Sequence, residues 1–309
     1  SAGTIWNPPT TSSILPGGVT KSAAGDVYII KDDGNIYYFN RRDNEFRKLD
    51  VGTVVFENVL QIVVDSSDIL WIFSSDGSNQ SYAIEKEKDE IKLSPHNHFN
   101  HPEKLLWASA ENNLLYFIDN TYAFYEYDLN SQKKYYIVDL ESEIHQRGEV
   151  SSIIKKQNDY YIGFKSSGLI QLKYQPDQKI KYIIQPTDIR TGIFCLLKDK
   201  FQDIIWIGTD GQGLYMYFAD TFSIKNTLLN TPAYQINNPV RALYLDDEQT
   251  LWIGTKGNGI LRMFNYHPEA ETDISLKTEQ LLTNNSTLTD KHAHAAILPS
   301  SVPYWKSGT

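Results

Sequence analysis

The sequence has little sulfur and no excess of positive charge. One cysteine, Cys195, stands among 309 residues, so no internal disulfide can form. The apolar residues around Cys195 favour a buried structural thiol over a reactive one. No apolar run is long enough to span a bilayer. Lys and Arg number 29 against 38 Asp and Glu, and the net charge of −9 argues against a nucleic-acid partner, which needs a basic surface.

Signatures of catalysis are missing as well. The sequence has no Gly-x-Ser-x-Gly elbow, no phosphate-binding loop and no paired-carboxylate signature. The spacing His96-x-His98-x-x-His101 is compatible with a zinc site, but no Cys or carboxylate partner accompanies it, and a solvated loop is the favoured interpretation. We therefore expect no cofactor, no metal and no enzymatic activity in this chain.

What the sequence does contain is a repeated β-type motif. Ile-Trp-Ile-Gly-Thr-Asp-Gly-Gln-Gly-Leu at 205–214 returns 46 residues later as Leu-Trp-Ile-Gly-Thr-Lys-Gly-Asn-Gly-Ile at 251–260. Asp210-Gly211 and Lys256-Gly257 supply residues that tolerate φ > 0, as a tight hairpin requires. The apolar runs are continuous rather than alternating, which predicts strands covered on both faces.

A period of about 45 residues runs through the whole chain. The aromatic anchors of successive second strands are spaced by 43, 45, 45, 45, 46 and 53 residues; they are Tyr28, Trp71, Tyr116, Tyr161, Trp206, Trp252 and Trp305. Each unit shows four short strand-like segments and almost no helical periodicity. This period is typical of β-propeller blades, so the sequence predicts an all-β, seven-bladed propeller.

The predicted seventh blade is incomplete, because the chain stops after its second strand. Two explanations remain open: either the N-terminal segment 4–7 supplies an outer strand that closes the ring, or the chain is part of a longer array of repeats. Residues 1–18 are predicted as an N-terminal strand and linker, and 19–309 as the propeller. The predicted blades are 19–56, 57–98, 99–142, 143–187, 188–232, 233–288 and 289–309, the last partial.

The repeated motif, preceded by an acidic turn at Lys198-Asp199 or Asp246-Asp247, resembles the two-component regulator propeller repeat. The fifth and sixth repeats match it well, the second and seventh match in part, and the others match only in period. In that family the repeats build the extracytoplasmic sensor of bacterial hybrid two-component systems, usually as two seven-bladed propellers before an immunoglobulin-like domain, a membrane helix, a histidine kinase and a response regulator. The chain resembles roughly the first propeller.

The resemblance implies a function that composition alone does not. It implies a periplasmic sensor domain with an oligosaccharide ligand released from a complex glycan, a homodimer in the full-length sensor, and a histidine kinase as the full-length protein. This part of the chain would contribute no membrane segment. Two alternatives stay open: a propeller lyase or glycosidase, whose active-site residues would be scattered among blades, and a protein-interaction or dimerisation scaffold.

Candidate ligand-binding residues lie on the connections before each first strand, which are expected to converge on one face. Arg and His there offer planar donors for carboxylate, sulfate or sugar hydroxyls. The candidates are His98, His101, Arg147, Arg190, Arg241, His292 and His294. Phe99, Phe194 and Tyr234 are nearby aromatics that would stack on a sugar face. The alternative is that these residues solvate the loops or hydrogen-bond carbonyls, and the Trp and Gly of the motif are expected to be architectural.

Overall fold

The computed structural model describes residues 13–52, 54–87, 90–96, 101, 103–218, 223–225, 238–257, 259–264 and 277–280. The chain divides into two compact units, Ser1–Asp139 and Leu140–Thr309, called unit 1 and unit 2 below. Each unit holds three four-stranded antiparallel sheets, with the strands of each sheet in chain order. This confirms the predicted all-β propeller architecture, with each sheet as one blade.

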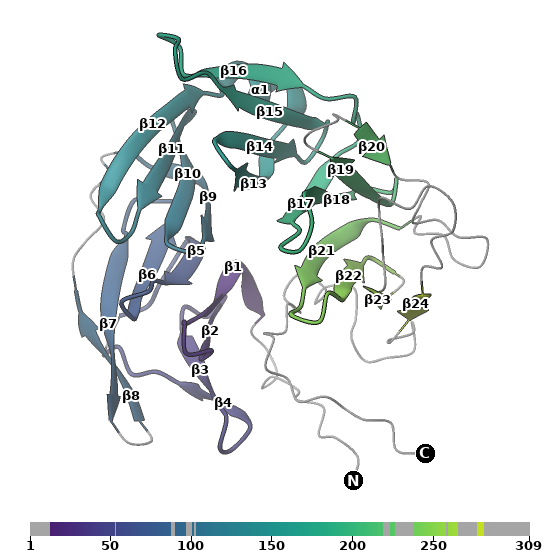
Figure 1. The fold of residues 1–309 in the computed structure, drawn as a ribbon. Coiled ribbons are helices and arrows are strands. Elements are labelled where there is room, and N and C mark those ends of the chain that lie inside the picture. Colours follow the sequence, from purple (N-terminus) through teal and green to yellow (C-terminus); the bar gives the residue numbers. More distant parts are fainter. Residues whose placement is uncertain are drawn as a thin grey trace. The chain divides into compact units, whose positions relative to one another are not determined.

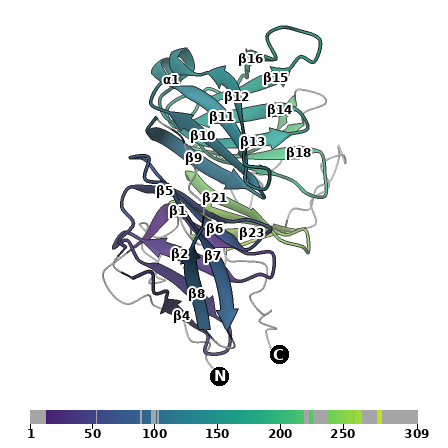
Figure 2. The ribbon, with the colours of Figure 1, turned by 90° about the vertical axis from the view of Figure 1, so that its left-hand side faces the viewer.

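Unit 1 contains blades one to three. Its strands are β1 (Ile14–Lys21), β2 (Val27–Lys31), β3 (Ile36–Asn40), β4 (Glu45–Lys48), β5 (Val59–Val64), β6 (Ile69–Ser74), β7 (Gln80–Glu87), β8 (Glu90–Pro95), β9 (Leu105–Glu111), β10 (Leu114–Asp119), β11 (Ala123–Asp128) and β12 (Lys133–Asp139). First strands β1, β5 and β9 lie on one side of the unit and fourth strands at the opposite edge (Figure 1). Figure 2 shows the hairpin of β7 and β8 from the side.

Unit 2 contains blades four to six. Its elements are α1 (Glu141–Arg147), β13 (Val150–Lys156), β14 (Asp159–Phe164), β15 (Leu169–Tyr174), β16 (Tyr182–Pro186), β17 (Ile193–Lys198), β18 (Ile204–Thr209), β19 (Leu214–Phe218), β20 (Ser223–Lys225), β21 (Val240–Leu245), β22 (Leu251–Thr255), β23 (Ile260–Phe264) and β24 (Lys277–Gln280). The first strands β13, β17 and β21 again lie side by side (Figure 1).

The blades of each unit stack face to face, and strand β6 shows how. Leu70 and Ile72 pack into a core shared with blade one, whereas Trp71 and Phe73 pack against Phe117 of blade three. Successive side chains of a strand point to opposite faces, so a strand between two neighbouring blades is apolar at every position. The continuous apolar runs therefore correctly predicted strands buried on both faces, and β18 is buried along its whole length.

The hairpins predicted from the two motif copies are confirmed. β18 pairs with β19 and β22 with β23, both antiparallel. The corner glycines Gly211 and Gly257 have φ of 82° and 97°, in the left-handed region that favours glycine. Each corner is closed by a threonine: the Thr209 hydroxyl donates to the Gly213 carbonyl at 2.6 Å, and Thr255 makes the matching bond.

The prediction of seven blades is wrong, because the described residues form six four-stranded sheets. Six anchors, Tyr28 to Trp252, each lie on the second strand of one sheet. The seventh anchor, Trp305, and the segment 4–7 fall outside the described residues. Blade one needs no strand from elsewhere, since β1 pairs with β2 and completes it. Sequence reasoning treated Pro16-Gly17-Gly18 as a linker, whereas these residues belong to β1, whose pairing is irregular between Ile14 and Val19.

A short helix, α1, was not expected from the sequence. It occupies seven residues between β12 and β13 and has Glu141 and Glu143 in its first turn. His145 and Arg147 lie in its last turn, where positive charge is favoured by the helix dipole. The helix is too short to show hydrophobic periodicity, and none of its residues is buried. Its consequence for the candidate site is that it fixes Arg147 just before blade four.

Candidate ligand-binding site

One backbone hydrogen bond recurs at the start of every blade. The residue just after the second strand donates its N–H to the carbonyl of the residue just before the first strand, over N···O distances of 2.8 to 2.9 Å. The pairs are Asp32–Ser13, Ser75–Asn58, Asn120–Lys104, Lys165–Glu149, Asp210–Gly192 and Lys256–Pro239. We call this end of a blade, where the first strand begins, the entry end. The opposite end, with the turn between strands one and two, is the turn end.

A β-bulge also recurs at the entry end. In blades two to six, the pairing of the first strand with the second skips one residue, always the second residue of the first strand. The bulged residues are Leu60, Leu106, Ser151, Phe194 and Arg241. A bulge leaves one residue outside the ladder and re-aims its side chain, a feature common beside functional sites. The five bulged residues thus differ in chemistry on a backbone frame that repeats.

Arg241 and Phe194 meet at the entry end of unit 2. They occupy the bulges of the adjacent strands β21 and β17. The guanidinium carbon of Arg241 lies 3.5 Å from the centre of the Phe194 ring, a close cation–π contact. Arg241 is partly buried, and its Nε has no hydrogen-bond acceptor among the residues that the structure describes. The structure therefore brings one predicted cation and one predicted aromatic into direct contact.

Cys195, next to Phe194, is the structural thiol that the sequence predicts. Its Sγ lies 3.7 Å from the carbonyl oxygen of Val240, to which it donates a weak hydrogen bond. Burial raises the pKa of the Cys195 thiol to about 12, although the neighbouring Arg241 acts in the opposite direction. A thiol with so high a pKa stays protonated at neutral pH and is a poor nucleophile.

Ser167 links Arg147 and Arg190 at one corner of blade four. Arg147 Nε donates to Glu143 Oε2 at 2.6 Å, and its carbonyl accepts the Ser167 N–H. The Ser167 hydroxyl donates to the Arg190 carbonyl at 3.2 Å, and the Arg190 side chain is exposed. The corner needs glycine at Gly168, since φ there is 82° and an added Cβ would lie 2.6 Å from a backbone oxygen. Arg147 is already paired with a carboxylate, whereas Arg190 extends into solvent.

His101 lies inside blade three rather than on an open loop. Its ring is buried against Phe117 and Tyr125, with Nε2 3.2 Å from Asp119 Oδ2 and Nδ1 3.0 Å from Lys134 Nζ. Burial lowers the pKa of the His101 imidazole, and the positive charge of Lys134 lowers it further. The neutral ring fits both contacts, with Nε2–H donating to Asp119 and Nδ1 accepting from Lys134. His101 therefore contributes to the packing of blade three rather than to an open binding surface.

The remaining predicted residues fall outside the described part of the chain. These are the ligand candidates His98, His292 and His294 and the aromatics Phe99 and Tyr234. Within the described residues, no group of three or more His, Cys, Asp or Glu side chains is placed to hold a metal ion. The described part also contains no helix with the length and apolar character that crossing a membrane requires.

At the turn end, sequence reasoning assigned no role to a set of aspartates. In three blades an aspartate accepts a hydrogen bond from the indole N–H of the anchor tryptophan at 2.8 to 2.9 Å: Asp65 with Trp71, Asp199 with Trp206, and Asp246 with Trp252. The other carboxylate oxygen accepts two backbone N–H groups of the turn. The signal in the sequence is an Asp six or seven residues before each of these three tryptophans.

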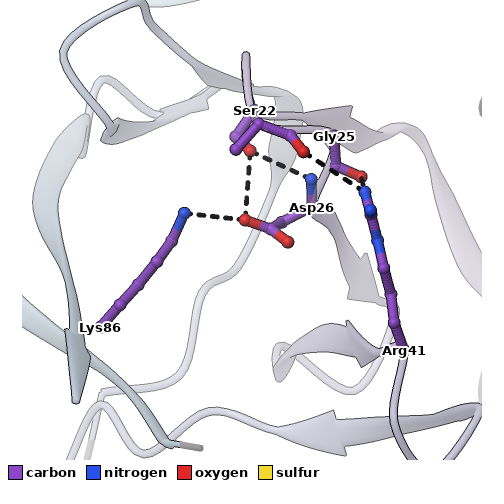
Figure 3. Close-up of polar contacts among 6 residues, drawn as sticks. Ser22, Gly25, Asp26, Arg41 and Lys86 are labelled. Atoms are coloured by element: carbon purple, nitrogen blue, oxygen red, sulfur yellow. Dashed lines mark hydrogen bonds and ion pairs between the residues drawn. The ribbon is translucent and has the colours of Figure 1, made fainter. Parts of the chain in front are cut away.

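Blade one has a different polar cluster at its turn end (Figure 3). Asp26 Oδ2 accepts from Lys86 Nζ of blade two at 2.8 Å, and the Asp26 N–H donates to the Ser22 hydroxyl at 3.1 Å. Arg41 Nη2 donates to the Gly25 carbonyl beside them. Lys86 and Asp26 pair across two blades and Arg41 binds a carbonyl of the same turn, so the cluster ties blades one and two together.

Comparison with known proteins identifies the repeat. The model of the two-component regulator propeller matches residues 234–257, which include β21 and most of the motif at 251–260. Histidine kinase P4 of Formosa agariphila is 25% identical over 254 residues, which cover 79% of this chain and 18% of that protein. The chain thus spans under a fifth of the length of this curated relative.

Two solved structures share the fold. The extracellular domain of a protein from B. thetaiotaomicron assigned as a one-component system is 21% identical with a TM-score of 0.58, over 91% of this chain and 35% of that one. A second, assigned as a hybrid two-component system of the same organism, is 17% identical with a TM-score of 0.53, over 79% and 33%. The resemblance predicted from the motif copies is therefore confirmed, and residues 234–257 are a two-component regulator propeller repeat.

Proposed function

We propose that this chain is the extracytoplasmic, periplasmic ligand-sensing propeller of a hybrid two-component signalling protein. In this proposal it detects a glycan-derived oligosaccharide and regulates a downstream histidine kinase. The family repeat at 234–257 and the likeness to extracellular domains support the signalling role. The ligand would act through different affinities for two arrangements of the full-length sensor, since a ligand shifts an equilibrium only by that difference.

The observation that carries the proposal is the contrast between constant and variable positions at the entry ends. The same backbone bond and the same bulge return from blade to blade, while the bulged side chains change from leucine to serine, phenylalanine and arginine. The structural Asp–Trp arrangement keeps the same two residue types in three blades, whereas the bulge carries four residue types in five blades. Variable side chains on a rigid frame are the arrangement that binding surfaces use.

The alternative of a lyase or glycosidase has weaker support from the described residues. Catalytic acids and bases have shifted pKa values in open sites. Here the strongest pKa shifts belong to Tyr28, Tyr116, Tyr217 and Cys195, and burial is the main cause of each. These groups lie within the blades, where a glycan has no access. Their pKa values reflect packing of the sheets rather than preparation for proton transfer.

The alternative of a dimerisation scaffold is favoured by one observation. Tyr135 and Tyr136, on the edge strand β12, are 48% and 59% exposed. Exposed aromatic side chains on an unpaired edge strand are typical of contact surfaces. Light scattering distinguishes this scaffold from the sensor proposal: a stable dimer of the full chain that Tyr136→Ser converts to a monomer favours the scaffold.

Calorimetry of the full chain against a panel of neutral and acidic oligosaccharides tests the proposed function. We expect one chemical class of glycan to bind with micromolar affinity and remain intact after incubation. Circular dichroism first establishes that the protein is folded. Turnover of a panel member would favour the enzyme instead, and silence across the panel from folded protein would overturn the sensing proposal.

A further inference from the structure

Arg241 is held in an unusual state for a buried cation. Its guanidinium rests against the Phe194 ring, with 3.5 Å between the guanidinium carbon and the ring centre. Its Nε is buried and has no acceptor within the described part of the chain. Burying a charged donor without an acceptor costs free energy, so such a group in a native protein calls for a missing partner. Both side chains sit on bulges, which fix them at the start of β21 and β17.

The surroundings of Arg241 add positive charge at the same end of the blade. Lys256 is exposed and follows β22, and its N–H bonds the carbonyl of Pro239, two residues before Arg241. The Asn238 amide bonds the Lys256 carbonyl at 2.8 Å and steadies this corner. In the described residues, Arg241 makes no ion pair with a carboxylate. The neighbouring corner carries an exposed Asp210, so the positive character is local to blade six.

The stacking also determines which kind of partner fits. The guanidinium carbon lies close over the Phe194 ring, so a partner approaches the guanidinium from its outer edge, where its N–H groups point. Two parallel N–H donors in one plane match the two oxygens of a carboxylate. Nε itself is buried, so a partner reaches the guanidinium through the outer N–H groups on its two terminal nitrogens. A planar carboxylate is the simplest such partner.

We propose that Arg241, supported by Phe194, binds a carboxylate group of the ligand, so that the sensed oligosaccharide contains a uronic acid residue. This inference rests on the proposed function for the sugar and on Arg241 for the acid. Lys256 contributes longer-range attraction from the same corner. Phe194 is a positioning residue, because its ring supports the guanidinium while the carboxylate approaches the outer N–H groups.

The test is calorimetry of the full chain with glucuronate, galacturonate and digalacturonic acid, each beside its methyl ester. The esters keep the sugar and remove the charge. Arg241→Gln is expected to weaken binding of the acids by about tenfold to hundredfold, the usual range for a hydrogen-bonded charged group, and to leave the esters unchanged. Lys179→Gln removes the same charge from an exposed turn of unit 2 and is the matched control, expected to have no effect.

Further variants separate recognition from folding. Arg241→Lys keeps the charge but loses the planar donor pair, and about tenfold weaker binding of the acids is expected. Phe194→Leu is expected to weaken the acids and spare the esters, with an unchanged unfolding midpoint. The inference is overturned if the acids bind Arg241→Gln as well as wild type, if only neutral sugars bind, or if a sulfated disaccharide alone requires Arg241. The proposed function survives those results, whereas silence towards every sugar removes both.

Discussion

The two ends of each blade are built by opposite rules. At the turn end, three blades repeat one chemical arrangement, in which a carboxylate binds the anchor indole with one oxygen and the turn backbone with the other. At the entry end the backbone repeats and the side chains do not: the bulged residue is leucine, serine, phenylalanine or arginine. The comparison shows that the turn end keeps its side-chain chemistry in three blades, whereas the entry end keeps only its backbone arrangement.

The physical reason lies in what each end leaves unsatisfied. Trp206 is fully buried, and its indole N–H must have an acceptor, which Asp199 supplies at 2.9 Å. No other residue type serves the indole and two backbone donors as well, so this position tolerates little change. A bulged residue has left the ladder and supports no strand pairing, and its side chain is therefore free to differ between blades.

The largest effect in this comparison is expected from Asp199→Ala. The substitution strips acceptors from a buried indole and two backbone N–H groups, and we expect a loss of about 3 kcal/mol in the free energy of unfolding. Arg241→Ala at the entry end should cost less than about 1 kcal/mol, since Arg241 Nε has no acceptor within the described residues that the substitution would strip of its donor. Urea denaturation followed by tryptophan fluorescence measures both.

Asp246→Ala is the matched control for Asp199→Ala. It removes the same three bonds in blade six, but Trp252 is only partly buried and water can replace part of what is lost. We expect a loss of about 1.5 kcal/mol, roughly half that of Asp199→Ala. Equal losses for Asp199→Ala and Arg241→Ala would contradict the division of the blade into a structural end and a variable end.

An effect smaller than that of Asp199→Ala is expected from Gly208, the glycine that follows Trp206-Ile207 in the first copy of the motif. A Cβ on Gly208 would lie 2.5 Å from Cys195 Sγ and 2.9 Å from the Val240 carbonyl oxygen of the next blade. A backbone atom cannot move aside cheaply, so Gly208→Ala should cost about 2 kcal/mol. At Gly254, the same position of the second copy, the atoms nearest to a Cβ among the described residues belong to Ala242 of its own blade, the first at 3.4 Å.

Gly254→Ala is accordingly expected to change the unfolding free energy by less than about 0.5 kcal/mol. Differential scanning calorimetry of the two variants compares the sites under one condition. A large loss from both would mean that glycine is required by the hairpin itself. A large loss from Gly208→Ala alone would mean that glycine is required at this position because the following blade lies so close to it.

Periodicity predicted the fold better than it predicted the number of blades. Tyr28 and the five anchors after it each mark a second strand, because burial on both faces leaves an apolar signature that survives in any sequence. The first strand of blade one was missed because Pro16, Gly17 and Gly18 are typical of loops. The seventh blade was predicted from one tryptophan, Trp305, and one long gap, whereas the described residues form six complete sheets.

The candidate site was predictable by region more than by residue. The sequence placed Arg147, Arg190 and Arg241 near entry ends because polar connections precede each first strand. It offered no means to separate Arg147, which pairs with Glu143, from Arg241, whose Nε has no acceptor in the described chain. That difference depends on a helix of seven residues and on a bulge, neither of which has a periodic signature.

The smallest effect is expected at the entry end of blade three, where His101 shows that an entry residue can also be structural. The folded state lowers the pKa of His101 below the value of about 6.5 for an unfolded chain, so the unfolded chain binds more protons between the two pKa values. The stability that His101 contributes is complete above about pH 6.5 and declines as the pH falls through that window. Asp119 and Glu103 attract the imidazolium and offset part of the cost of burial and of repulsion from Lys134.

The urea midpoint should therefore fall slightly further between pH 7.5 and pH 5.0 for wild type than for His101→Gln, which does not titrate. If the urea midpoints of the two proteins fall equally between pH 7.5 and pH 5.0, His101 does not contribute to the loss of stability in acid. That result would contradict a structural role for this entry residue.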